Sequence, residues 1–134
     1  MLSMGNTFYT TTGGHWSVLS DSIQPKDKET QIYRKEEERV TLSCSYDTGG
    51  SYVYLYWYRQ FSNREPEFLL WKGARSGSSS EYIPDTHFQS TTSQTSTDLT
   101  INSVTLSDSA LYYCALKGRS KSETSFCTLQ GINE

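Results

Sequence analysis

The sequence predicts an all-β fold, a sandwich of two antiparallel sheets, from three observations. Apolar and polar residues alternate in short segments from residue 22 onward, which is the period of half-buried strands. Aromatic residues make up 13% of the chain, ten of them tyrosines, and Ser and Thr are frequent, a composition that favours strands. No segment has the apolar stripe of an ordinary helix, although residues 105–108 are compatible with a single turn.

The first strands are predicted before residue 72. Residues 40–44 and 53–57 each place apolar side chains on one face. Residues 67–71 form a shorter strand, which Pro66 restricts to a sheet edge or to a strand start, and a polar loop follows over 73–80. The opposite face of the 53–57 strand carries polar and aromatic side chains, namely Tyr54, Tyr56, Tyr58 and Gln60.

The later strands follow the same pattern. Phe88 marks one strand and Leu99 with Ile101 marks the next, joined by a turn in the Ser- and Thr-rich run 90–97. Residues 110–116 form the last clear strand. Beyond residue 117 the alternation stops, so the last strand of the sandwich is expected to be irregular or missing.

The 134 residues suffice for one domain with a single core. We expect the domain over 21–117, a disordered extension over 1–20 and an irregular tail over 118–134. The extension has neither the basic start nor the apolar run of a secretory signal, and no apolar stretch is long enough to span a membrane.

Composition and motif searches argue against several functions. A net charge of -3 and a pI of about 5.4 do not favour nucleic acid. The three cysteines have no CxxC spacing and neither histidine lies near them, so no metal site is predicted. No nucleophile motif or acid–base pair is evident, so we expect neither an enzyme nor a bound cofactor.

Four correlated positions carry the most information. Trp57 stands thirteen residues after Cys44, and Tyr112 stands two before Cys114, which is the pattern of immunoglobulin-like sandwiches. Two segments narrow the class of immunoglobulin-like protein further, namely WYRQ, which starts at Trp57, and DSALYYC, which ends at Cys114. Over about residues 22–117 the chain resembles T-cell receptor variable domains of alpha and delta type. The alternative interpretation is that the four are core residues of any such sandwich.

The resemblance implies specific roles for residues of the core and surface. It implies a disulfide between Cys44 and Cys114, with Cys127 left over. It implies a core that includes Trp57, Tyr112, Leu55, Leu99 and Ile101. Antigen-contacting loops would include Asp47, Thr48, Gly49, Gly50, Ser51, Tyr52, Lys72, Gly73 and Lys117. The face toward a partner domain would include Tyr56, Tyr58, Gln60, Pro66 and Tyr113.

The resemblance also implies a function and a location. Such a domain pairs with a beta- or gamma-type variable domain, recognises peptide presented by a histocompatibility molecule or a related ligand, and lies on the extracellular face of the plasma membrane. The outward tyrosines agree with a covered surface, although Tyr also tolerates solvent on outer sheet faces.

Two departures from the family pattern stand out. The joining-segment motif Phe, Gly, any residue, Gly is absent, since Phe126 is followed by Cys127 and Leu129 where both glycines belong. This favours an unrearranged or incomplete product, or alternatively a V-set domain of a non-rearranging innate immune or adhesion receptor. His87 stands where the family usually has the Arg that pairs with the equivalent of Asp108, and a neutral His would make a weaker bridge.

Overall fold

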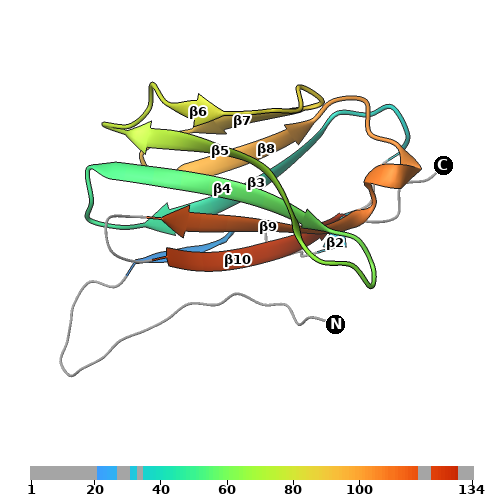
Figure 1. Ribbon diagram of the computed structural model, residues 1–134, viewed down its shortest axis with the longest axis horizontal. Helices are drawn as coiled ribbons and strands as arrows, with labels where there is room; N and C mark the ends of the chain where they lie inside the picture. Colours follow the sequence, from blue (N-terminus) through green and yellow to red (C-terminus); the bar gives the residue numbers. More distant parts are fainter. Residues whose placement is uncertain (1–20, 27–30, 33–34, 118–121, 130–134) are drawn as a thin grey trace.

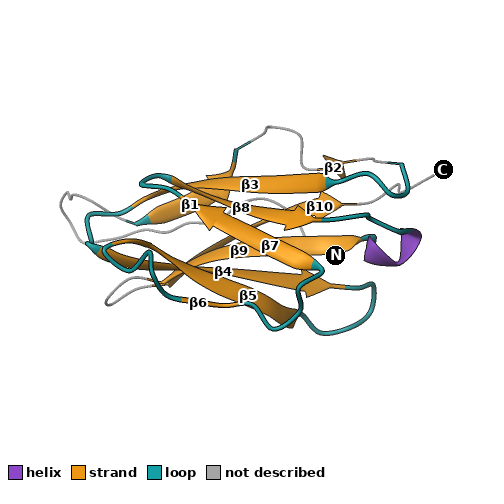
Figure 2. Ribbon diagram, turned by 90° about the horizontal axis from the view of Figure 1, so that it is seen from above, coloured by secondary structure: helices purple, strands orange, loops and turns teal. Residues whose placement is uncertain are grey.

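In the computed structural model two sheets pack face to face, as Figures 1 and 2 show. The structure describes residues 21–26, 31–32, 35–117 and 122–129, the short stretch 31–32 and the last segment by their backbone. The predicted extension over residues 1–20 lies outside the described residues. The fold class predicted from the alternating pattern, an all-β sandwich of two sheets, is confirmed.

The first sheet has four strands, and its order along the sheet differs from the order along the chain. All adjacent strands of this sheet pair antiparallel. The order is β1 (Ser22–Pro25), β3 (Val40–Asp47), β8 (Ser96–Ile101) and β7 (Phe88–Thr92).

The second sheet has six strands, antiparallel except where β2 and β10 run parallel. Its central strands β9 and β4 bring the outward tyrosines together. The order is β2 (Gln31–Ile32), β10 (Ser122–Leu129), β9 (Ala110–Lys117), β4 (Tyr52–Gln60), β5 (Glu67–Arg75) and β6 (Glu81–Tyr82).

The expectation that the last strand is irregular or missing is wrong. Residues 122–129, inside the segment predicted to be an irregular tail, form β10, which pairs with β9 from Ser122 opposite Lys117 to Leu129 opposite Ala110 without a register shift. The physical reason is that a strand is held by backbone hydrogen bonds, which need no particular side chain. The glycine motif would add a bulge, but its absence does not prevent pairing.

The core forms because each strand turns one set of alternate side chains inward. Leu55, Trp57, Leu99, Ile101 and Tyr112 are completely buried, which places all five predicted core residues between the sheets. The Trp57 indole Nε1–H donates to Thr97 Oγ1 at 3.3 Å, so its polar atom is satisfied inside the core.

A disulfide joins Cys44 on β3 to Cys114 on β9 and so connects the two sheets through the core. Both cysteines are fully buried, and Trp57 pairs with Cys114 across β4 and β9. The predicted pairing is therefore confirmed. The backbone of Cys127 lies in β10 opposite Tyr112.

The predicted turn is present as the 3₁₀ turn η1 (Leu106–Asp108), at the end of the sandwich where β9 begins (Figures 1 and 2). The Tyr112 hydroxyl donates to the Asp108 carbonyl oxygen at 2.6 Å, which fixes β9 to this turn. Burial, and secondarily the nearby Asp108 carboxylate, raise the pKa of Tyr112, so the hydroxyl remains a donor.

Candidate functional site

Several connections meet at the end of the sandwich opposite η1, which we call the loop end (Figure 1). The first loop, residues 48–51, joins β3 to β4, and the second loop, residues 76–80, joins β5 to β6. The sheet register places Tyr52 opposite Arg75 and Tyr54 opposite Lys117, so β9 ends at the same place. The sandwich thus presents the first loop, the second loop and the end of β9 side by side.

The first loop is exposed and partly ordered by side-chain hydrogen bonds. Thr48 Oγ1 donates to Asp21 Oδ1 at 2.9 Å and accepts the backbone N–H of Gly50 at 3.4 Å. Tyr52 exposes 55% of its surface, the largest aromatic surface at this end. The other predicted contact residues of this segment, Asp47, Gly49, Gly50 and Ser51, are also exposed.

The second loop begins later than the sequence indicates. Lys72 and Gly73, predicted as loop residues, lie within β5, which continues to Arg75. Gly73 is buried, and a Cβ there would stand 2.1 Å from the Gly77 carbonyl oxygen, so this glycine allows the loop to fold back over the strand. Lys72 Nζ lies 2.5 Å from Glu81 Oε1 and fastens β6 to β5. A buried glycine offers no side chain to a ligand, and we assign Gly73 a structural role.

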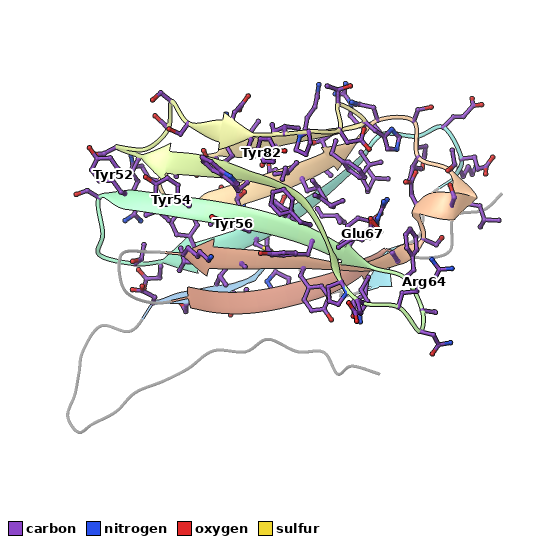
Figure 3. The ribbon with its side chains drawn as sticks, in the orientation of Figure 1. Tyr52, Tyr54, Tyr56, Arg64, Glu67 and Tyr82 are labelled. Carbon is purple, nitrogen blue, oxygen red and sulfur yellow. A yellow bond between two sulfur atoms is a disulfide. The ribbon has the colours of Figure 1, made fainter. Side chains whose placement is uncertain are left out.

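An aromatic surface covers the outer side of β4, β5 and β6. We define the aromatic face as Tyr54, Tyr56, Tyr58, Phe68, Trp71 and Tyr82. Figure 3 shows Tyr54 and Tyr56 along β4 and Tyr82 on β6. Sequence reasoning found the tyrosines of β4 but not Phe68 or Trp71, whose strand it placed without assigning a face.

The rings of the aromatic face are in mutual contact. Tyr56 stacks on Tyr58 with a centroid separation of 6.3 Å, and Phe68 meets the edge of Tyr58 at 6.0 Å. Phe68 also stacks on Tyr82 at 6.0 Å. Lys117 Nζ stands 4.8 Å from the Tyr56 centroid, where the ring attracts a cation. The face is therefore continuous from the loop end across three strands.

Gln60, Pro66 and Tyr113 lie beside the aromatic face. The Tyr113 hydroxyl donates to Gln60 Oε1 at 2.6 Å, and Gln60 Nε2 donates to the Arg64 carbonyl oxygen at 2.9 Å. Burial raises the pKa of Tyr58 and of Tyr113, and Tyr56 adds to the rise at Tyr58, so these hydroxyls stay neutral. Pro66 is exposed just before β5. Four of the five predicted partner-face residues, those on β4 and β9, thus lie together.

A charged cluster forms at the opposite end, around the buried Asp108. His87 Nε2 lies 3.4 Å from Asp108 Oδ2, the contact predicted from the resemblance. Arg59 Nη1 lies 3.7 Å from Asp108 Oδ1, and its guanidinium stands 5.3 Å from the Phe88 ring. Arg59 was not predicted as a partner, because only the fold brings β4 beside η1. The cluster is structural and lies away from the loop end.

In the described residues, no three His, Cys, Asp or Glu side chains are grouped so that they could hold a metal ion. No helix within the described ranges is long and apolar enough to cross a membrane.

The geometry and the comparisons with known proteins agree. Residues 27–129 match the family model described as the immunoglobulin V-set domain, and the match includes both cysteines of the disulfide and β10. The chain belongs to the immunoglobulin V-set family. Within this family it is a variable domain of T-cell receptor type.

Relatives from Homo sapiens define the subgroup. The T cell receptor alpha variable 14/delta variable 4 is 33% identical over 87% of this chain and 99% of its own length. Alpha variable 18 is 40% identical over 66% of this chain and 77% of its own length. Alpha variable 38-2/delta variable 8 is 36% identical over 74% of this chain and 83% of its own length. The V-set domain described here is thus an antigen-receptor module and not an enzyme.

Proposed function

We propose that this V-set domain is the recognition module of an alpha/delta-type T-cell receptor chain. It pairs with a second variable domain, of beta or gamma type, through the aromatic face. It binds peptide presented by a histocompatibility molecule, or a related ligand, through the loop end. As part of a receptor it lies on the extracellular face of the plasma membrane, where the oxidising environment suits the disulfide between Cys44 and Cys114.

The aromatic face is the observation that carries the pairing proposal. Phe68 and Tyr82 expose 38% and 54% of their surfaces and stack on each other, beside four further aromatic side chains. Contiguous exposed apolar surface of this kind marks an interaction site, and aromatic residues are enriched at interface cores. A partner domain covering this face would remove those rings from water.

Gln60 also supports placing a partner domain on the aromatic face. Its side-chain amide has two N–H donors and two acceptor lone pairs. Within the described part of the chain its side-chain contacts, to Arg64 and Tyr113, use one donor and one lone pair. The other donor and lone pair are available to the matching amide of a partner domain, the bond that the family resemblance implies.

The ligand proposal rests on the loop end. Its exposed loops are fixed to a core that the disulfide and Trp57 hold rigid, which is how binding loops are commonly carried. Tyr52 and the small residues that precede it combine a rigid aromatic contact with adaptable polar groups, a composition typical of antigen-binding loops.

Pairing is tested by mixing the oxidised chain with purified beta-type and gamma-type variable domains and measuring association by sedimentation velocity. We expect a heterodimer with at least one type. Phe68→Ser removes a central ring of the aromatic face and is expected to raise Kd at least tenfold, which corresponds to about 1.4 kcal/mol.

The matched control is Leu106→Ser. Leu106 is the most exposed large apolar residue among those described, at 63%, but it lies on η1 away from the aromatic face. Its substitution is expected to leave Kd unchanged. Equal Kd values for wild type and Phe68→Ser would contradict pairing through this face, and absence of any heterodimer would contradict the pairing proposal itself.

A second candidate function follows from β10. This strand pairs with β9 in continuous register although its sequence lacks the joining-segment glycines. A V-set domain of a non-rearranging innate immune or adhesion receptor would have such a strand. A recombination signal after the codons for residues 115–117 would favour a rearranging gene and an unrearranged or incomplete product. A clean splice to a membrane-anchor exon would favour the second candidate.

A further inference from the structure

Arg75 has an unusual backbone conformation at the loop end. It is the last residue of β5 and has a φ of 58°, in the left-handed region. Glycine adopts this region freely, whereas any residue with a Cβ is disfavoured there. Contacts of the Arg75 side chain must therefore offset the strain of its backbone, and strained residues of this kind often lie at functional sites.

The guanidinium of Arg75 binds carbonyl groups of two separate segments. Nη1 donates to the carbonyl oxygens of Thr48 and Gly50, each at 2.8 Å, in the first loop. Nε and Nη2 donate to the carbonyl oxygen of Gln94, at 3.0 and 2.7 Å, in the turn between β7 and β8. One planar side chain thus connects the loop that joins the two sheets to a turn of the first sheet.

The turn 93–95 is held at each of its carbonyl groups. The Tyr46 hydroxyl donates to Ser93 O at 2.6 Å, Arg75 binds Gln94 O, and the Tyr46 backbone N–H donates to Thr95 O at 2.9 Å. The Arg75 guanidinium stands 5.2 Å from the Tyr46 ring centroid. Burial raises the pKa of Tyr46, which keeps its hydroxyl a donor. The turn therefore has a fixed position relative to Arg75.

The second loop is attached to the same assembly by its backbone. Ser76, the first residue after Arg75, donates its N–H to the Ser51 carbonyl oxygen at 3.0 Å. Because Arg75 ends β5 directly before this bond, its side chain and its backbone together determine how the first and second loops stand relative to each other.

We propose that Arg75 is a positioning residue that holds the first loop, the start of the second loop and the turn 93–95 as one preorganised surface. The ligand-binding consequence rests on the proposed function: a surface ordered before binding loses less conformational entropy when a ligand docks.

The test is hydrogen exchange of the intact oxidised chain, resolved to individual amides by NMR. The reporter amides are those of Ser76 in the second loop, Ser93 in the turn and Ser96, the first residue of β8. The Ser96 amide reports on the turn because it donates to Ser93 Oγ, and the Ser76 and Ser93 amides each donate a hydrogen bond within this assembly. In Arg75→Ala we expect all three to exchange at least fivefold faster, while the amides of β4 and β9 exchange as in wild type.

Two further variants separate positioning from charge. Arg75→Lys keeps a cation near Tyr46 but lacks the planar fork that reaches both segments, so the reporters should exchange at rates between wild type and Arg75→Ala. Lys72→Ala removes a cation from the same strand, where it pairs with Glu81 and not with the loops. It should leave the three reporters unchanged.

Two results would overturn the proposal. Unchanged reporter exchange in Arg75→Ala would show that the loops are ordered without the guanidinium. Faster exchange in β4 and β9 to the same degree would show a general stability role and no specific positioning. Both readouts use the domain alone, without partner or ligand, so a failure here is distinct from a failure of the pairing experiment.

Discussion

The hydroxyl of Tyr112 offers a sharp test of how the η1 corner stabilises the domain. Tyr112 is completely buried, and its only polar side-chain atom donates to the Asp108 carbonyl oxygen at 2.6 Å. Tyr112→Phe keeps the ring and its packing but removes the donor. The buried carbonyl of Asp108 then loses that partner at a place where bulk water does not readily replace it.

The magnitude follows from the two contributions of that bond. A neutral intramolecular hydrogen bond contributes about 1 kcal/mol net, and a buried acceptor left without its donor costs about 1–3 kcal/mol. We therefore expect the free energy of unfolding to fall by about 2 kcal/mol. For a domain of this size that change lowers Tm by roughly 8 °C or more.

The adjacent residue provides the control. Tyr113 points to the outer face, where its hydroxyl donates to Gln60 Oε1 at a partly exposed position. Tyr113→Phe also removes one hydroxyl, but water can replace the lost bond, so the expected loss is below about 0.5 kcal/mol.

Urea unfolding of both variants, followed by tryptophan fluorescence and fitted with a common slope, measures the difference directly. Equal losses for Tyr112→Phe and Tyr113→Phe would refute the reasoning, because they would show that burial of the acceptor does not determine the cost. A loss below about 0.5 kcal/mol for Tyr112→Phe would refute it as well.

Three further predictions concern the core, a close backbone approach and alkaline pH. Reducing the disulfide, whose cysteines lie 70 positions apart, should lower the free energy of unfolding by about 4 kcal/mol, seen as a lower urea midpoint with added phosphine reductant. Gly73→Ala should lower the free energy of unfolding by about 1–3 kcal/mol, because its Cβ would meet the Gly77 carbonyl. Its control is Gly49→Ala, whose Cβ would meet no neighbouring atom within 4 Å and which should change the free energy of unfolding by less than about 0.5 kcal/mol in the same assay. Because the pKa of Tyr112 is higher in the folded than in the unfolded chain, its contribution is complete below pH of about 10 and is lost as pH rises further. Urea midpoints between pH 8 and 11 should therefore fall more steeply for wild type than for Tyr112→Phe, and parallel curves would contradict this.

The core was predictable from the sequence because its signals are local. Alternation identifies which side chains of a strand point inward, and the spacing of Cys44, Trp57, Tyr112 and Cys114 is specific enough to indicate the pairing of sheets. The His87–Asp108 contact followed from the family resemblance and is present in the structure.

The parts that sequence reasoning missed depend on partners distant in the chain. The strand β10 forms because β9 offers a free edge, and residue types alone do not reveal that. Gly73 reads as a loop residue until the Gly77 carbonyl is seen to approach it. Arg75 gives no signal in a polar segment, because its meaning comes from Thr48 and Gln94, which only the folded sandwich brings within reach. The functional roles of the loop and face residues stay predictions for the experiments above.

The parallel pair of β2 and β10 bears on how the domain responds to mechanical load. Gln31 lies opposite Thr128 and Ile32 opposite Leu129, so a strand near the start of the domain runs alongside its last strand in the same direction. When the chain is pulled at the residues before β2 and after β10, the force acts along the axes of the two strands, in opposite directions. The interstrand hydrogen bonds are then strained together, in shear, and do not open one after another as in a zipper. A receptor module tethered at one end and pulled at the other would therefore resist separation of β2 from β10.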